Sequence, residues 1–248
     1  MGRIVQRLTH GPCHHFFGYY DKCPCDATGR YVLALETGFS DRPPGPEDNA
    51  AVGMVDPAES GRWIPLAETV AWNWQQGAML QWLPADAERL IIYNARQGHR
   101  FVSVVRDVQS GATRTLPRLV YAVSRDGRSA LTLNFSRLHH GRPGYGYAGL
   151  PDPGLDHPAP EEDGIWWMDL ETGQCRQIVS LGTVAALDPL PSMGGAKHWF
   201  NHLQFNTDDS RFVFLHRWRG TDIFRTRMFT ARPDGSEMSG WRGPCIDR

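Results

Sequence analysis

The chain has 248 residues, with 26 Lys and Arg against 27 Asp and Glu, and so a formal charge of −1. Nucleic-acid-binding proteins usually carry a basic excess, and this balance argues against that class. A hydrophobic content of 41% with 21% charged residues excludes a disordered chain. The sequence has no apolar run near the roughly 18 residues of a membrane span, no signal-peptide pattern and only five scattered cysteines. We therefore expect a cytoplasmic protein that binds neither nucleic acid nor membrane.

Turn formers alternate with short apolar runs along the whole chain. The 26 Gly and 18 Pro are interleaved with β-branched residues and with 9 Trp, 7 Tyr and 11 Phe. This pattern is typical of many short strands. No window repeats apolar residues at helical spacing over three turns. The predicted class is all-β.

A first repeated pattern is a polar turn, an arginine and then an apolar strand. An apolar strand also precedes each turn, so that each copy predicts a hairpin. The arginine is expected to be an exposed hairpin residue. The copies are Asp26–Arg30 before YVLALE, Ala85–Arg89 before LIIYN, Arg125–Arg128 before SALTLNF and Thr207–Arg211 before FVFLHRW.

A second hairpin follows each first one. Its copies are VGMVDPAESGRWIPL, VSVVRDVQSGATRTL, IWWMDLETGQCRQIV and RMFTARPDGSEMSGW. Two hairpins make a four-stranded antiparallel sheet, and tandem units of roughly 40–60 residues are typical of β-propeller blades. We place four blades of a single propeller domain at about residues 14–70, 78–118, 119–181 and 199–241. The alternative is a β-sandwich whose turns only resemble a repeat.

Pro- and Gly-rich loops interrupt the blades at residues 38–51, 137–164 and 182–200, and loops on one rim of a rigid scaffold commonly carry function. The last unit ends in GWRGPCIDR, which has no strand pattern. The sequence therefore predicts an incomplete ring of a larger propeller. An open ring leaves edge strands unpaired, which favours self-association through the open blade edge.

Histidines are the main polar candidates. The innermost strand of a propeller blade starts near the central channel, so His14, His15, Gln81 and His202 are expected at one mouth of that channel. A neutral imidazole there can accept a proton or bind a metal. The alternative is that each histidine only hydrogen-bonds a loop carbonyl.

The loop from Asn134 to Tyr147 concentrates cations, imidazoles and tyrosines. Arg137, His139, Arg142 and Tyr145 would suit an anionic, hydroxyl-rich ligand such as an acidic glycan. The alternative is a solvated irregular loop.

Cys23 and Cys25 are separated by a single proline. The proline and the expected strand geometry disfavour a redox role, and we expect both thiols to be buried.

Four segments resemble a group of bacterial propeller proteins and, more remotely, the oligogalacturonate lyases and TolB-type propellers. They are HHFFGYYDKCPCDATGRYVLALE, MLQWLPADAERLIIYN, YAVSRDGRSALTLNFSRLHHGRPGYGY and HLQFNTDDSRFVFLHRW. His202, an apolar strand, His216 and then Arg227 resemble a lyase blade with a catalytic histidine and arginine. The resemblance implies seven blades and a Mn²⁺ held by His and Gln side chains of later blades, so no metal ligand is assigned in this chain.

This resemblance implies a β-elimination on acidic oligosaccharides. A neutral His202 or His216 would remove the proton beside a uronate carboxylate, and Arg227 would stabilise the charge that develops. His14, His15 and Lys22 would line the mouth. The alternatives are a non-catalytic propeller that binds a glycan or a protein, and a truncated scaffold. The catalytic interpretation requires His202, His216 and Arg227 within about 6 Å of one another.

Overall fold

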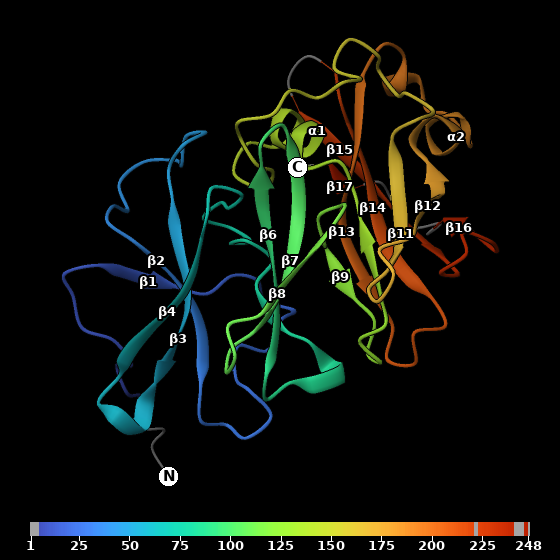
Figure 1. Cartoon of the computed structure of the whole chain (residues 1–248). Helices are drawn as coiled ribbons and strands as arrows, with labels where there is room; N and C mark the ends of the chain where they lie inside the picture. The colour runs from blue at the N-terminus through green and yellow to red at the C-terminus, as the bar shows by residue number, and fades with distance from the viewer. Residues whose placement is uncertain (1–4, 221–222, 241–245, 248) are drawn as a thin grey trace. The chain divides into compact units, whose positions relative to one another are not determined.

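The computed structural model describes residues 5–220, 223–240 and 246–247. The chain folds into antiparallel sheets, with few and short helices (Figure 1). It divides into two compact units, Met1–Thr115 and Leu116–Arg248. Each unit holds two sheets of consecutive strands.

The first unit consists of two four-stranded sheets in simple up-and-down order. The strands of its first sheet are β1 (His14–Phe16), β2 (Val32–Thr37), β3 (Ala50–Asp56) and β4 (Arg62–Thr69). Those of the second are β5 (Gln81–Trp82), β6 (Leu90–Gln97), β7 (Arg100–Asp107) and β8 (Thr113–Leu116). Two 3-10 turns, Pro57–Glu59 and Pro84–Asp86, lie in the connections.

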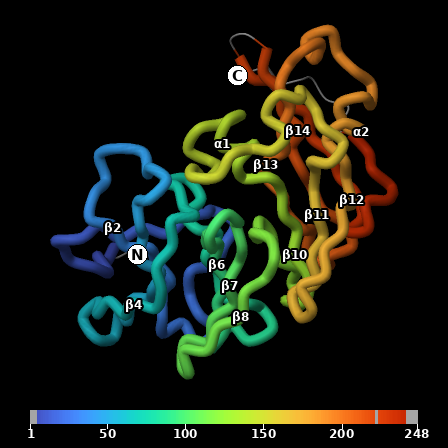
Figure 2. The backbone as a smooth tube through the Cα atoms, turned by 45° about the horizontal axis from the view of Figure 1, so that its top comes forward, coloured from blue at the N-terminus to red at the C-terminus, as the bar shows by residue number. Residues whose placement is uncertain are grey.

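The second unit repeats this arrangement. Its first sheet has β9 (Ala122–Val123), β10 (Ser129–Thr132), β11 (Gly164–Asp169) and β12 (Cys175–Ser180). Its second has β13 (Lys197–Phe205), β14 (Phe212–Arg219), β15 (Phe224–Ala231) and β16 (Ser239–Gly240), and β17 (Ile246–Asp247) also pairs with β15. The helices are α1 (Phe135–Gly141), α2 (Leu181–Ala186) and the 3-10 turn Pro191–Met193. Helix α1 lies beside β13, as the backbone trace in Figure 2 shows.

The prediction of an all-β propeller built from four-stranded blades is confirmed by these sheets. The single propeller domain, the incomplete ring and self-association through an open blade edge stay predictions. Cys23 and Cys25 are both exposed, which corrects the expectation that they are buried. Within the part of the chain that the structure describes, no helix is long and apolar enough to cross a membrane.

Two short helices occupy loops in which the sequence predicted none. Helix α1 begins after Asn134, whose side chain accepts a hydrogen bond from the Arg137 amide at 3.0 Å. Helix α2 begins after Ser180, which caps the Thr183 amide at 3.2 Å. Such side-chain caps satisfy amide groups that have no partner inside the helix. At seven and six residues the helices are too short to show a helical apolar period.

The repeated arginines hold the two hairpins of a sheet together. Arg30 pairs with Asp56 at 3.0 Å, and Arg89 pairs with Asp107 at 2.7 Å. Each arginine side chain is about half exposed, at 52% and 51%, as the sequence predicted, whereas each aspartate side chain is buried. Both aspartates also accept turn amides, and the hydrogen bonds from Ser110, followed by that from Arg89, hold the pKa of Asp107 below its usual range.

Apolar side chains fill the space beside the long strands. In the first unit the buried cluster includes Leu33, Val52, Trp72, Ile91 and Tyr93. In the second unit, Phe212, Phe214 and Phe229 are each less than 4% exposed. These near-continuous apolar strands are those expected of sheets that are covered on both faces.

Candidate functional site

Strands β13, β14 and β15 carry all three predicted catalytic residues, His202, His216 and Arg227. Their register pairs Phe200 with His216 and His216 with Arg227. Directly paired residues of antiparallel strands lie on the same face, and side chains alternate along each strand. His198, two residues before Phe200, therefore shares the face of His216 and Arg227, whereas Arg217 lies on the opposite face.

A continuous hydrogen-bonded ladder crosses this first face. Arg227 Nε donates to His216 Nδ1 at 3.0 Å, and His216 Nε2 lies 2.8 Å from His198 Nδ1. His198 Nε2 then lies 3.5 Å from the Met193 carbonyl oxygen. The two imidazole rings are stacked, with an interplanar angle of 11°. We call His198, His216 and Arg227 the histidine ladder.

The arginine fixes the tautomers of both histidines. A guanidinium has only donors, so His216 Nδ1 must be an unprotonated acceptor and His216 carries its proton on Nε2. That proton is donated to His198 Nδ1, which leaves the His198 proton on Nε2, facing the Met193 carbonyl. Both imidazoles are therefore neutral when the ladder is intact.

Burial supports the neutral state. Desolvation lowers the pKa of His198 to about 4 and, with the adjacent His198 and Arg227, lowers the pKa of His216 well below its usual value. His216 is 0% exposed. Arg227 donates to the carbonyl oxygens of Val184, Leu187 and Asp188, and so fastens helix α2 and its following loop to the sheet.

His202 does not join the ladder. It lies in a β-bulge between Asn201 and Gln204, with φ +55°. Its amide donates to Asn201 Oδ1 at 2.8 Å and to Tyr121 Oη at 3.1 Å, which holds the bulge in place. Its ring lies 6.0 Å from that of Tyr145. Of the three predicted catalytic residues, His216 and Arg227 are in contact, and the histidine bonded to His216 is His198.

A second group of residues combines arginines with aromatic rings. The Arg142 guanidinium lies 4.3 Å from the Tyr145 ring centroid and 4.8 Å from that of Phe224. Arg217 and Arg219 lie 5.1 Å and 5.8 Å from the Phe224 centroid. Three cations thus surround one phenyl ring, at distances typical of cation–π contacts. The arginine–aromatic cluster consists of Arg142, Tyr145, His202, Arg217, Arg219 and Phe224.

Two of the three arginines of this cluster have no carboxylate partner among the described residues. Among the described residues, neither Arg142 nor Arg219 forms an ion pair with a carboxylate. Both side chains are partly exposed, as are Tyr145 and Phe224, whereas Arg217 is 8% exposed. The cluster therefore offers positive charge and aromatic surface together, which suits an anionic ligand with apolar ring faces.

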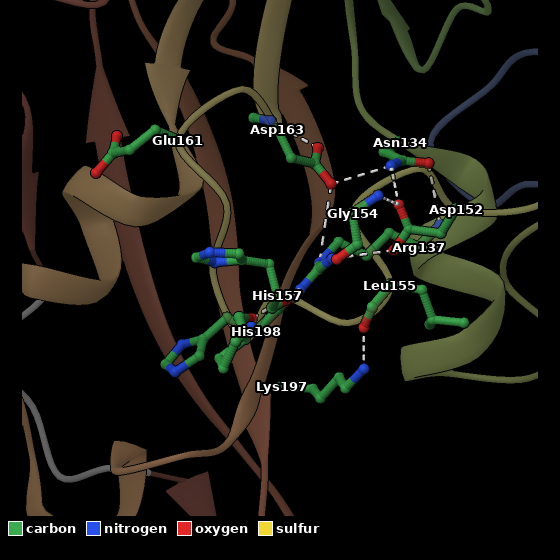
Figure 3. Close-up of polar contacts among 12 residues, drawn as sticks. Asn134, Arg137, Asp152, Gly154, Leu155, His157, Glu161, Asp163, Lys197 and His198 are labelled. Atoms are coloured by element: carbon green, nitrogen blue, oxygen red, sulfur yellow. Dashed lines mark hydrogen bonds and ion pairs between the residues drawn. The ribbon is translucent and has the colours of Figure 1, made fainter.

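Arg137, predicted to bind substrate, instead organises the loop that follows helix α1. It is 4% exposed and pairs with Asp152 at 2.9 Å. Its other donors reach the carbonyl oxygens of Gly154, His157, Pro158 and His198. Figure 3 shows the guanidinium enclosed by these groups, with Asn134 bridging Asp152 and Asp163. With its donors used in this way, Arg137 is not available to a ligand in this structure.

Asp163 is the most perturbed carboxyl group of this network. Burial raises its pKa to about 6, against the opposing effects of the Asn134 hydrogen bond and the Arg137 charge. A cavity of about 10 Å³ borders Asn134, Arg137 and Asp163. That volume is about the minimum that a single water molecule requires.

The remaining predicted residues lie outside the histidine ladder and the arginine–aromatic cluster. His139 is half-buried on α1, and burial followed by the adjacent His140 lowers its pKa. The other three belong to the first unit: His14 is exposed, His15 Nε2 lies 2.9 Å from Glu36, and Lys22 forms a buried ion pair. Burial lowers the pKa of Lys22 although Asp21 opposes the shift. Their convergence with residues of the second unit stays a prediction.

A metal site does not emerge from the described residues. No group of three or more His, Cys, Asp or Glu side chains in residues 5–220, 223–240 and 246–247 could hold a metal ion.

Comparisons with known proteins found similar backbones at low sequence identity. No protein-family model and no curated protein matches the chain. The backbone is similar to that of an oligogalacturonate lyase in complex with manganese, with 12% sequence identity and a TM-score of 0.46, over 97% of this chain and 69% of that chain. It is also similar to TolB from Acinetobacter baumannii, with 14% identity and a TM-score of 0.38, over 88% of this chain and 54% of that one.

A third similar structure is the AtxE2 isopeptidase, with 11% identity and a TM-score of 0.37, over 87% of this chain and 43% of that one. The chain thus spans about half of the TolB chain and less than half of the isopeptidase. The oligogalacturonate lyase and TolB are β-propeller proteins. These likenesses concern the fold and assign no activity.

Proposed function

We propose that this chain is a propeller-type module that binds acidic oligosaccharides through the arginine–aromatic cluster. The observation that carries the proposal is the set of three guanidinium groups around Phe224, of which Arg142 and Arg219 form no ion pair among the described residues. Guanidinium groups bind carboxylates through charge-assisted hydrogen bonds. Tyr145 and Phe224 offer ring surface to the apolar faces of sugars.

The geometry supports binding more directly than it supports β-elimination at His216. A general base must reach the proton that it removes, and its pKa should be close to the working pH. His216 is fully buried and its pKa is strongly lowered, and Arg227 donates to three backbone carbonyls. The polar groups of His216 and Arg227 are thus used in hydrogen bonds within the protein.

His202 favours a second candidate function. It is partly exposed and lies beside Tyr145 in the arginine–aromatic cluster. A neutral histidine next to arginines that hold a uronate carboxylate is the arrangement that β-elimination requires. In this alternative His202 is the base, and the cluster arginines stabilise the developing charge.

Calorimetric titration of the full chain with size-defined oligogalacturonates tests the proposal, with neutral maltooligosaccharides as the ligand control. We expect binding that weakens with salt. Loss of one charge-assisted hydrogen bond should weaken binding about tenfold in Arg142→Gln or Arg219→Gln. Arg128→Gln is the matched control, because it removes the same charge from an exposed arginine of the same unit.

Equal affinity for the neutral ligand, or wild-type affinity in both cluster variants, would refute the proposal. The same samples are assayed for unsaturated product by its ultraviolet absorbance, with and without Mn²⁺. Product that is lost in His202→Asn and kept in His216→Asn would support the second candidate. Binding without product supports the non-catalytic module.

A further inference from the structure

A polar pocket lies beside the segment that leads into β1, in the first unit. Its volume is about 300 Å³, and residues between Arg7 and His15 line it. This volume is at the lower end of the range of small-molecule sites, about 300–1,000 Å³. The lining includes Arg7, His14 and His15 but no carboxylate. A pocket of this size and charge suits a small anion.

The segment before β1 is attached loosely to the first sheet. The Leu8 carbonyl oxygen lies against Gly61, where a Cβ would overlap it, so the close approach requires a glycine. Among the residues that the structure describes, no hydrogen bond or ion pair joins residues 5–13 to the strands. A segment held in this way can shift to admit a ligand while β1–β4 stay in place.

His15 brings an unpaired nitrogen to this pocket. Its side chain is 8% exposed, and its ring centroid lies 4.8 Å from that of Trp63. His15 Nε2 lies 2.9 Å from Glu36 Oε2, and a carboxylate accepts hydrogen bonds, so Nε2 carries a proton. Within the described part of the chain, His15 Nδ1 and Trp63 Nε1 are both buried without a hydrogen-bond partner. Buried polar atoms are nearly always hydrogen-bonded, so these two atoms indicate a missing group.

The groups that lack partners here are donors. The indole nitrogen of Trp63 can only donate, and so can the guanidinium of Arg7. Arg7 Nε donates to the Thr9 carbonyl oxygen at 2.7 Å, and its two terminal nitrogens have no partner among the described residues. A histidine ring donates from both nitrogens when it is protonated. The missing group must therefore supply several acceptor oxygens and negative charge, which a phosphate group does with three oxygens.

We propose that this pocket binds a phosphate group, either free or as the monoester of a small molecule. The terminal nitrogens of Arg7 donate to the phosphate oxygens through charge-assisted hydrogen bonds. His15 Nδ1 donates to another phosphate oxygen, while Nε2 remains on Glu36, its register partner on β2. The site lies wholly within the first unit and is separate from the arginine–aromatic cluster.

Calorimetric titration of the full chain tests the proposal with three probes. They are inorganic phosphate, glucose 6-phosphate as a monoester, and glucose as the neutral control. We expect both phosphates to bind, glucose not to bind, and the affinity for phosphate to fall as salt is added. Tighter binding of glucose 6-phosphate would assign the site to monoesters, and tighter binding of inorganic phosphate would assign it to the free ion.

Variants identify the two binding groups. Arg7→Gln removes a charge-assisted hydrogen bond and should weaken phosphate binding about tenfold. His15→Gln places an amide near the position of Nε2, toward Glu36, and leaves no donor at the position of Nδ1, so it should lose a similar factor. His15→Asn places its amide near the position of Nδ1 and should keep most of the affinity. The matched controls are Arg100→Gln and His99→Asn, which change exposed residues of the same unit and should bind as wild type does.

Several results would overturn the proposal. They are no phosphate binding by wild type, wild-type affinity in both Arg7→Gln and His15→Gln, and equal binding of glucose and glucose 6-phosphate. An equal loss in Arg100→Gln and Arg7→Gln would show unspecific attraction of anions to the unit. Loss of phosphate binding in Arg142→Gln would instead assign the phosphate to the arginine–aromatic cluster.

Discussion

The pH dependence of stability provides a direct test of the histidine ladder. The pKa of His198 is lowered from 6.5 to about 4, chiefly by burial. Between these values the unfolded chain binds a proton at this residue and the folded protein does not. The contribution of neutral His198 to the free energy of unfolding is fully present above about pH 6.5 and is lost as the pH falls toward 4. At about 1.4 kcal/mol for each pH unit, this loss is roughly 3 kcal/mol.

Asp163 acts in the opposite direction. Its pKa is raised from 3.8 to about 6, so the folded protein binds a proton in this range that the unfolded chain does not. The free energy of unfolding therefore rises as the pH falls through 6, by roughly 3 kcal/mol at full protonation. The two contributions offset each other in the wild type, and single variants are needed to reveal them.

The variants are His198→Asn, whose Oδ1 keeps an acceptor for His216, and Asp163→Asn. Urea unfolding is measured in steps between about pH 7 and 4. Relative to wild type, we expect the stability of His198→Asn to rise by roughly 3 kcal/mol as the pH falls over this range. The stability of Asp163→Asn should fall by a similar amount. A flat difference for His198→Asn would refute the assignment of a buried neutral ladder.

Three further substitutions test other parts of the second unit. Arg137→Met leaves Asp152 buried without its cation, and should lower the free energy of unfolding, measured in urea, by about 3–5 kcal/mol. The control Arg142→Met loses only cation–π contacts, and should lower it by about 1 kcal/mol or less. Arg227→Met removes the donor to one carbonyl of helix α2 and to two of the loop after it, so amide hydrogen exchange should rise in residues 181–193. A rise spread evenly over the chain would contradict this. Gly146→Ala places Cβ against Phe135 O and His139 N and should cost about 1–3 kcal/mol in urea unfolding, whereas Gly220→Ala meets open space and should be near neutral.

The sheets could be predicted from the sequence because their turns are marked by residues that favour special backbone geometry. Gly29 and Gly127 have φ values of +73° and +68°, in hairpin turns that follow aspartate. Each apolar strand that follows is long enough to recognise. The helices α1 and α2 could not be predicted, because one or two turns do not establish an apolar period.

The site was only partly predictable, and β13 shows why. His198 and His202 are four residues apart on one strand, so simple alternation places both on the face of His216. The bulge inserts one extra residue after Asn201 and reorients His202. The residues near His202 in the sequence do not predict this bulge, because one of the groups that holds it in place is the Tyr121 hydroxyl, 81 positions away. Of the three residues expected to converge, the structure therefore brings only His216 and Arg227 into contact, and His198 is the histidine beside His216.

The same reasoning separates the roles of the two faces of this sheet. Desolvation keeps the ladder imidazoles neutral, and every polar atom that the ladder offers is directed at another group of the fold. On the other side, guanidinium groups packed against Phe224 keep their charge, because arginine does not deprotonate in proteins. A buried neutral relay can fasten a loop but attracts no anion, whereas the partly exposed, permanently charged Arg142 and Arg219 attract one at any physiological pH. This division of roles predicts that ligand affinity depends on Arg142 and Arg219 but not on His216.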